Sequence, residues 1–446
     1  MYDTTQSICP ECLLPIDAHL VEREDALYII KECAEHGHYE AVHPLGSPFI
    51  YHAMKTLFAN SSQCSGSRGL LINITSDCNQ SCSFCYAQTN NYHEKELSLD
   101  EILTMVSRFK GEYIYLAGGE PTLRDDLSAI IYEIAQRGYK VILLTNGKKL
   151  AQQGYALRLK KSGLSLVILQ FDTFDEKQCE LLRGERLVST KLQAIENLKR
   201  ASIPIFLFVL LVKDVNTDQI SSIIHFAAQR SEYIKIVNFQ PVWSVGRVGV
   251  YEQMNISDIF AAVTQSSNLT IADFIADTTF IFYVSEILRK LQHKIHRAYP
   301  MCELRCGMVT IGTEVMSLGR LFNIEKAIKH LRALNDILNK HNRFKRVHFL
   351  LTVPYWFIIT EIIRRRKLHK TFFALFKNGV QMIFKKNKRL CLSDIKIFSL
   401  IVGTFHTAYN ADLSVMKTCN LNSHLADGQF KPFCLRQIVT MRQHQS

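Results

Sequence analysis

The sequence predicts an α/β protein with a parallel central sheet, a small N-terminal metal-binding domain and a C-terminal extension. Apolar runs that read as strands alternate with helical stretches between about residues 70 and 240. Unbroken apolar strands of this kind are typical of a parallel sheet that is buried on both faces. The chain has 446 residues, 47% hydrophobic and 21% charged, so it can bury a large core and form two or three domains.

The central region contains six expected strands. They cover residues 70–75, 113–118, 140–146, 164–171, 203–212 and 233–239. Helices are expected between them at 98–109, 125–137, 191–201 and 219–229. The first helix begins at Ser98-Leu-Asp-Glu101, which has the capping-box pattern.

Three closely spaced cysteines follow the first strand. Cys78, Cys82 and Cys85 have the spacing C-x3-C-x2-C, and the aromatic Phe84 precedes the last of them. A cubane [4Fe–4S] cluster normally takes four thiolates, so a trio leaves one iron open to a small-molecule ligand. A structural zinc site with a fourth ligand elsewhere is the alternative that spacing alone leaves open.

A glycine-rich turn ends the second strand, about thirty-five residues later. Its sequence is Gly118-Gly119-Glu120-Pro121. Glycines allow the backbone to approach a ligand closely, and proline fixes a turn. Together with the cysteine trio, this GGEP motif resembles the radical S-adenosylmethionine (radical SAM) superfamily.

The resemblance implies a cofactor pair and a barrel. The trio would bind a [4Fe–4S] cluster, the GGEP turn would bind the amino group of SAM, and reduction would release a 5′-deoxyadenosyl radical. The fold would be a partial (β/α)6 TIM-type barrel, with its site at the C-terminal ends of the strands. Polar residues at those ends could hold the ribose and adenine, although each is also a common loop cap: Asn146, Gln170, Asp172, Asn216 and Gln240.

The N-terminal segment carries a second metal-ligand pattern. Cys9-Pro-Glu-Cys12 and Cys33-Ala-Glu-His36 form two knuckles separated by an expected hairpin. Two facing knuckles suit a tetrahedral zinc ion or a rubredoxin-type iron. His38 and Cys64 are competitors for the fourth position.

A third cysteine group is dispersed along the C-terminal extension. It comprises Cys302, Cys306, Cys419 and Cys434, which could hold an auxiliary [4Fe–4S] cluster. The alternative is that some of these are buried thiols, as we expect for the isolated Cys179 and Cys391.

Further patches resemble one branch of the superfamily, which contains tetraether lipid synthases and pterin-methylating enzymes. They are the N-terminal knuckles, Phe239-Gln-Pro-Val-Trp-Ser-Val-Gly-Arg247 and the tail from Tyr409 to Cys434. The branch commonly has a C-x3-C-G-x-C segment before the first barrel strand. Here residues 60–69 keep only Cys64, so a cluster at that place is not expected.

The basic excess is concentrated in one segment. The net charge is +12, and residues 343–389 hold thirteen Lys or Arg against one acid, Glu361. Aromatic and aliphatic stretches lie between these charges, although Pro354 and the short length argue against a membrane span. The segment suits a helical cover over the barrel mouth, contact with an anionic membrane surface, or, as the weakest alternative, nucleic acid.

These patterns predict three domains and one enzyme class. The domains are an N-terminal zinc-ribbon or rubredoxin-like domain at 1–60, a radical SAM barrel at 65–250 and an extension at 251–446. The resemblance implies methylation or carbon–carbon bond formation on a lipid-like or pterin-like small molecule, with ferredoxin or flavodoxin as reductant. A peptide-modifying maturase and a non-enzymatic zinc-stabilised adaptor are the alternatives. The start of the chain lacks a secretory signal pattern, and its clustered cysteines suit a reducing compartment, so we expect a cytoplasmic protein, with peripheral membrane contact as an alternative and no nucleic-acid partner.

Overall fold

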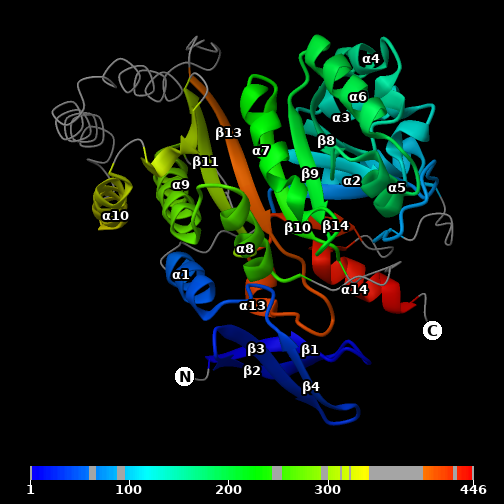
Figure 1. Ribbon diagram of the computed structural model, residues 1–446. Coiled ribbons are helices and arrows are strands. Elements are labelled where there is room, and N and C mark those ends of the chain that lie inside the picture. The colour runs from blue at the N-terminus through cyan, green and yellow to red at the C-terminus, as the bar shows by residue number, and fades with distance from the viewer. Residues whose placement is uncertain are drawn as a thin grey trace.

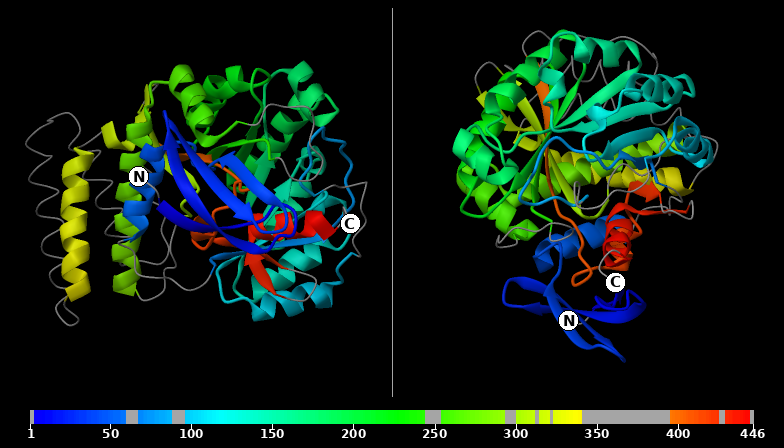
Figure 2. Two further views of the ribbon diagram at one scale, coloured as in Figure 1. Left: turned by 90° about the horizontal axis from the view of Figure 1, so that it is seen from below. Right: turned by 90° about the vertical axis from the view of Figure 1, so that its right-hand side faces the viewer.

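A computed structural model describes residues 3–59, 67–87, 96–243, 254–292, 300–311, 314–320, 323–340, 395–424 and 429–443. All structural statements below concern these residues. Figures 1 and 2 show a large mixed sheet surrounded by helices, with a small separate sheet at one end.

The central sheet contains the six expected strands as parallel neighbours. In sequence order they are β5 (Gly69–Thr75), β6 (Tyr113–Gly118), β7 (Lys140–Thr145), β8 (Leu164–Gln170), β9 (Ile205–Leu211) and β10 (Ile234–Pro241). Each pairs in parallel with the next one along the chain. The α/β class and the parallel core are therefore confirmed.

Helices between these strands cover one face of the sheet (Figure 2, right). They are α2 (Leu99–Arg108), α3 (Leu127–Gln136), α4 (Tyr155–Lys161), α5 (Glu176–Arg183), α6 (Val188–Arg200) and α7 (Ile220–Gln229). Helix α2 begins with the predicted capping box at Ser98. Alternate strand side chains, such as Ile72, Leu116 and Leu207, form a single core cluster with helix residues such as Ile130. We call this side of the sheet the outer face.

The extension adds strands to both edges of the barrel sheet, which the sequence did not predict. β13 (Ile395–Gly403) pairs in parallel with β10, and β11 (Glu303–Ile311) and β12 (Glu314–Ser317) continue beyond it. At the other edge, β14 (Leu421–His424) pairs with β5 and carries β15 (Phe430–Pro432). The sheet thus has eleven strands among the described residues.

Helices of the extension lie beside this enlarged sheet. They are α8 (Ile256–Ser266), α9 (Ile271–Gln292), α10 (Ile324–Lys340), α13 (Leu413–Met416) and α14 (Phe433–Gln443). Helices α9 and α10 pack against each other, and α9 packs on β11 (Figure 1).

The N-terminal sheet is antiparallel and packs on the extension. Its strands are β1 (Asp3–Ile8), β2 (Pro15–Arg23), β3 (Ala26–Cys33) and β4 (Gly37–Val42), and α1 (Pro48–Ala59) follows. The buried Lys31 ammonium donates to the carbonyls of Ile8 and Ala408 at 2.8 and 2.7 Å. Asp412 accepts from Thr5 at 2.8 Å and lies 3.2 Å from His43. These buried polar contacts fix the small sheet against residues 406–416.

Candidate active site

The cysteine trio lies on the loop that follows β5. Cys78, Cys82 and Cys85 are all partly exposed. Burial, and also the proximity of Glu120, Cys82 and Cys85, raise the pKa of Cys78 to about 11. Three thiols near the C-terminal end of a strand, still reachable from outside, are placed as a cofactor site requires.

The glycines of the GGEP turn are required by contact with this loop. A Cβ atom on Gly118 would lie 2.2 Å from the Thr75 carbonyl oxygen, and one on Gly119 would lie 2.1 Å from that of Asp77. Gly118 also has a φ of +129°, a backbone conformation that suits glycine. The amides of Gly119 and Glu120 donate to Thr75 and Asp77 at 2.8 and 2.7 Å. The turn therefore positions the cysteine loop directly.

Glu120 organises the strand ends from a buried position. Its carboxylate accepts from the Thr122 amide at 3.1 Å, from the Thr122 and Thr145 hydroxyls at 2.6 and 2.7 Å, and from the Asn146 amide at 2.7 Å. Pro121 is buried beside it at the start of a 3₁₀ turn. The turn after β6 is thus linked to the end of β7.

An arginine that sequence reasoning missed contacts the trio. Arg183 donates to both Asp172 oxygens at 2.7 and 2.9 Å, and its third nitrogen lies 3.7 Å from Cys82 Sγ. Its guanidinium carbon lies 4.7 Å from the centre of the Phe84 ring. Although burial opposes charge, the Asp172 carboxylate raises the pKa of Arg183. The only sequence signal was an arginine shortly after a strand-end aspartate.

The structure gives three predicted SAM ligands internal partners. The Asp172 carboxylate forms the ion pair with Arg183 described above. The Asn216 side chain donates to the carbonyls of Asp172 and Leu210 at 3.0 and 2.8 Å. Gln170 Oε1 accepts from Lys191 at 3.0 Å. These hydrogen bonds fix the ends of β8 and β9, so the three residues are not among the SAM contacts that we propose.

Two other predicted residues remain at the rim. The Asn146 amide donates to Asn79 on the cysteine loop at 2.9 Å. Gln240, on the last residues of β10, is buried, and its Oε1 has no hydrogen-bond partner among the described residues.

Three C-terminal cysteines come together, and the fourth does not. Burial, then the nearby Glu303, Cys419 and Cys434, raise the pKa of Cys302. Cys306 instead lies on the outer side of β11, where its thiol donates to Asp277 Oδ2 at 3.3 Å. Cys302 precedes the first residue of β11, whereas Cys306 lies within the strand and donates to Asp277, so Cys306 leaves the proposed ligand set.

Aromatic side chains connect the two cysteine groups. The Trp243 ring stacks on Phe405 at 4.7 Å between centroids and lies 6.3 Å from Tyr86, which follows Cys85. Phe433, which precedes Cys434, lies 5.8 Å from Tyr86. The trio loop and the C-terminal cysteines therefore share one packed aromatic cluster.

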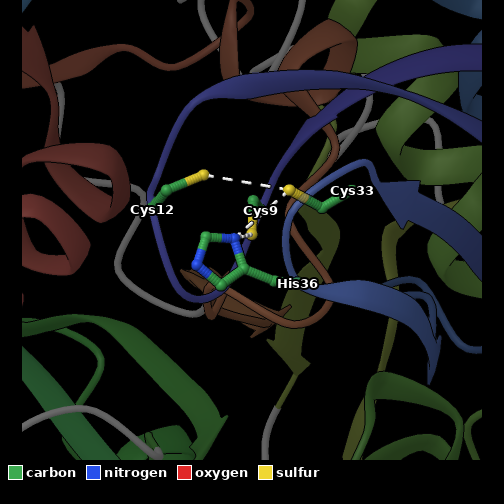
Figure 3. A group of neighbouring side chains, drawn as sticks. All are labelled: Cys9, Cys12, Cys33 and His36. Atoms are coloured by element: carbon green, nitrogen blue, oxygen red, sulfur yellow. Dashed lines mark hydrogen bonds between the residues drawn. The ribbon is translucent and has the colours of Figure 1, made fainter.

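The four side chains of the N-terminal knuckles lie close together (Figure 3). The ligand atoms of Cys9, Cys12, Cys33 and His36 all lie within 4.8 Å of one another. Cys12 and Cys33 sulfurs are 4.0 Å apart, and His36 Nδ1 lies 3.4 Å from Cys33 Sγ. A tetrahedral zinc with Zn–S bonds of about 2.3 Å requires sulfurs roughly 3.8 Å apart, so this group fits one ion.

Several expectations lie outside the described residues. They are Cys64, Cys391 and the whole basic segment at 343–389. None of the helices within the described ranges combines the length and apolarity needed to cross a membrane.

Both family models and individual known proteins match this chain. Residues 72–227 match the radical SAM superfamily, and residues 1–43 match the HMPTM N-terminal zinc ribbon domain. The 7,8-dihydro-6-hydroxymethylpterin dimethyltransferase of Methanocaldococcus jannaschii is 27% identical over 97% of this chain and 93% of its own length. A probable GTP 3′,8-cyclase of Pyrococcus abyssi is 29% identical over 38% of this chain and 56% of its own length.

Solved structures give weaker likenesses. Streptococcus suis SuiB bound to precursor peptide SuiA is 18% identical, with a TM-score of 0.40 and coverage of 45% of each chain. The structure of anSMEcpe with bound AdoMet is also 18% identical, with a TM-score of 0.37, covering 51% of this chain and 67% of its own. The sequence match spans the strands and the loop that hold the cysteine trio, so the chain has a radical SAM domain at residues 72–227 and an N-terminal zinc ribbon domain at residues 1–43.

Proposed function

We propose that this enzyme cleaves SAM reductively at a [4Fe–4S] cluster held by Cys78, Cys82 and Cys85. The 5′-deoxyadenosyl radical would remove a hydrogen atom, and a separate methyl-group donor would supply the carbon that methylates a pterin-like heterocycle. The cluster would supply one-electron reduction of the sulfonium, with the electron coming from a ferredoxin- or flavodoxin-type donor. The observation that carries the proposal is the trio's position on the β5 loop, directly against the GGEP turn.

The surroundings of the trio support a cofactor site over a structural zinc site. The match to the radical SAM superfamily spans the trio, and the loop that carries these cysteines lies against the GGEP turn. Within the described residues, the group whose ligand atoms all lie within 4.8 Å of one another is the N-terminal one.

The chain's own residues would hold and shield the cofactors. Gly118 and Gly119 bring the turn close to the cysteine loop, which leaves its exposed backbone beside the open position. Glu120 keeps one carboxylate oxygen with a single hydrogen bond, from Asn146, so this oxygen can still accept from an amino group. Arg183 adds a fixed positive charge next to Cys82.

The pterin-like substrate rests on one relative. The dimethyltransferase resembles this chain over 97% of its length, whereas the Pyrococcus abyssi cyclase matches only 38% of it. Among described residues, Cys302, Cys419 and Cys434 form the additional cysteine group, which we propose holds an auxiliary [4Fe–4S] cluster. The N-terminal group would hold zinc or iron.

Anaerobic reconstitution tests the radical chemistry. Purified protein is loaded with iron and sulfide, reduced, and given SAM; 5′-deoxyadenosine is then measured by mass spectrometry. We expect its formation, and we expect Cys82→Ser to abolish it. The conservative control is Cys179→Ser, because Cys179 is a buried thiol in a separate apolar cluster.

Substrate assignment needs a separate readout. Extracts and purified 6-hydroxymethylpterin would be incubated with the active enzyme, and products with added methyl mass would be sought. A protein that carries only zinc at the trio and forms no 5′-deoxyadenosine would refute the proposal. Cleavage of SAM without any methylated heterocycle would support the radical SAM activity and refute the proposed pterin-like substrate.

A further inference from the structure

The two faces of the barrel sheet are covered to different extents. Outer-face side chains of β9, such as Leu207 and Val209, are fully buried against helices. Their neighbours Phe206, Phe208 and Leu210 point to the opposite side and stay partly exposed. We call this opposite side the inner face. Large apolar side chains left partly exposed inside a barrel are typical of a ligand-binding surface.

Polar side chains gather on the inner face at one place. Asn238 and Gln240 lie on β10, and Glu303 and Arg305 lie on β11. The intervening strand β13 brings them into register, since Gly403 is opposite Glu303 and Ile401 is opposite both Asn238 and Arg305. Four hydrogen-bonding side chains therefore occupy two adjacent rows of the sheet.

The glycine at the end of β13 makes room for this group. A Cβ atom on Gly403 would lie 2.8 Å from Gln240 Nε2 and 3.3 Å from Glu303 Cγ. These two side chains thus lie over the bare backbone of Gly403. Since Glu303 also adjoins Cys302, the polar group lies beside the C-terminal cysteines.

The two amide side chains of the group have hydrogen-bonding capacity that the described residues do not use. Asn238 and Gln240 are 2% and 4% exposed, and Asn238 Oδ1 and Gln240 Oε1 have no partner among the described residues. Glu303 pairs with Arg305 at 2.9 Å. A buried polar atom without a partner destabilises the folded state, so such atoms in a native protein need an explanation.

Tyr115 on β6 also belongs to the inner face. It is partly exposed and alternates with the buried Ile114 and Leu116. Its ring lies beside Gly69 of β5, where a Cβ atom would come within 2.5 Å of it.

We propose that Asn238, Gln240, Glu303 and Arg305 form the substrate-recognition surface, and that they bind a flat, uncharged nitrogen heterocycle through its amide and amidine edge. This inference deepens the proposed function and rests on it for the reaction itself. Each amide can accept and donate, as a ring edge with adjacent N–H and C=O groups requires. A carboxylate accepts two N–H groups of an amidine, and Arg305 can donate to a ring carbonyl.

The same chemistry disfavours a lipid tail. A saturated chain would leave Asn238 and Gln240 unpaired and buried, and it would place the Glu303–Arg305 pair against hydrocarbon. A flat ring instead satisfies the polar side chains along its edge, while its faces can contact rings such as Tyr115 and Phe208. The surface thus discriminates between the two substrate classes that the sequence left open.

The test measures binding by the loaded holoenzyme, not turnover. The probe is 6-hydroxymethylpterin, with affinity followed through its fluorescence; guanosine and a short-chain dialkyl glycerol ether are the comparison ligands. We expect the wild type to bind the pterin and not the ether. Asn238→Leu and Gln240→Met keep size but remove hydrogen bonds, so each should weaken pterin binding at least tenfold.

The matched control is Gln229→Met on the exposed end of α7, which should bind as the wild type does. Melting curves identify any variant that fails to fold. If an amide variant fails to fold, Glu303→Gln is tested in its place; it keeps the shape of the side chain, removes its charge and should also weaken pterin binding. Unchanged pterin affinity in the folded variants, or tighter binding of the ether than of both heterocycles, would overturn the inference. Wild-type SAM cleavage is measured separately, so a failure here is distinct from failure of the radical chemistry.

Discussion

Arg183 and Asp172 form a two-pronged ion pair that is buried, with N···O distances of 2.7 and 2.9 Å and side chains 4% and 2% exposed. The pair leaves one guanidinium nitrogen 3.7 Å from Cys82 Sγ. A structural ion pair thereby brings a permanent cation to one thiol of the proposed cluster.

Removal of this cation should make the cluster harder to reduce. A unit charge at about 4 Å in a medium of effective dielectric 20 contributes up to about 4 kcal/mol, so Arg183→Met should shift the reduction potential to more negative values. Redox titration followed by electron paramagnetic resonance measures the shift. Arg183→Lys keeps the charge and should restore part of the potential.

The same variant should lose stability. An uncompensated buried Asp172 costs roughly 3–5 kcal/mol, whereas an exposed pair contributes at most about 1 kcal/mol. Arg186→Met, which breaks the exposed pair with Glu180, is the control for denaturant unfolding. Equal potentials in the wild type and a folded, fully loaded Arg183→Met protein would refute the electrostatic role.

The contact of the GGEP turn with the cysteine loop predicts a steep penalty at Gly119. Its Cβ would lie 2.1 Å from a backbone oxygen, so Gly119→Ala must displace the loop, and iron content per chain should fall. Gly138→Ala is the control, because no atom lies within 4 Å of its Cβ and only its φ of +86° is strained. That strain costs about 1–2 kcal/mol. Metal analysis and thermal melting of both variants check this difference.

The N-terminal group should bind one metal ion. Cys33→Ser should lose that ion and lower the melting temperature, since the ion joins two knuckles of the small sheet. His38→Ala should keep it, because His38 is exposed and lies outside the four-ligand group. Elemental analysis distinguishes zinc from iron. A His38→Ala protein without metal would contradict the assignment.

The C-terminal cysteines predict a difference in iron content. Cys434→Ser should lower iron from about eight to about four atoms per chain, because Cys434 adjoins Cys302 and Cys419. Cys306→Ser should leave the iron count unchanged, since its thiol is bonded to Asp277 on the outer face. Four irons in both the wild type and Cys434→Ser would exclude the auxiliary cluster.

Asp277 predicts a pH dependence of folding. Burial raises its pKa from 3.8 to about 6. Because the folded pKa exceeds the unfolded one, its contribution to stability is complete below about pH 4 and is lost as pH rises through 6. The change is on the order of 3 kcal/mol. Melting temperatures between pH 4 and 7 should show this slope in the wild type and a flatter one in Asp277→Asn.

Features that depend on local residue patterns could be predicted before the structure was known. Continuous apolar runs predicted the six parallel strands, and a four-residue signature predicted the capping box at Ser98. Tight spacing was enough for the N-terminal group, because knuckles of two ligands each are brought together by one hairpin. The proximity of the cysteine trio and the GGEP turn could also be predicted, because each motif follows one of two neighbouring parallel strands.

Contacts between residues far apart along the chain could not be predicted, because they depend on how the strands pair and pack. Cys302 and Cys306 lie four residues apart in one segment, but only Cys306 lies within β11, where its thiol donates to Asp277. The sequence predicts Asp172 as a SAM ligand, but its carboxylate forms an ion pair with Arg183, eleven residues later. The placement of β13 beside β10 brings Gln240 next to Glu303, a relationship set by pairing between strands that are far apart along the chain.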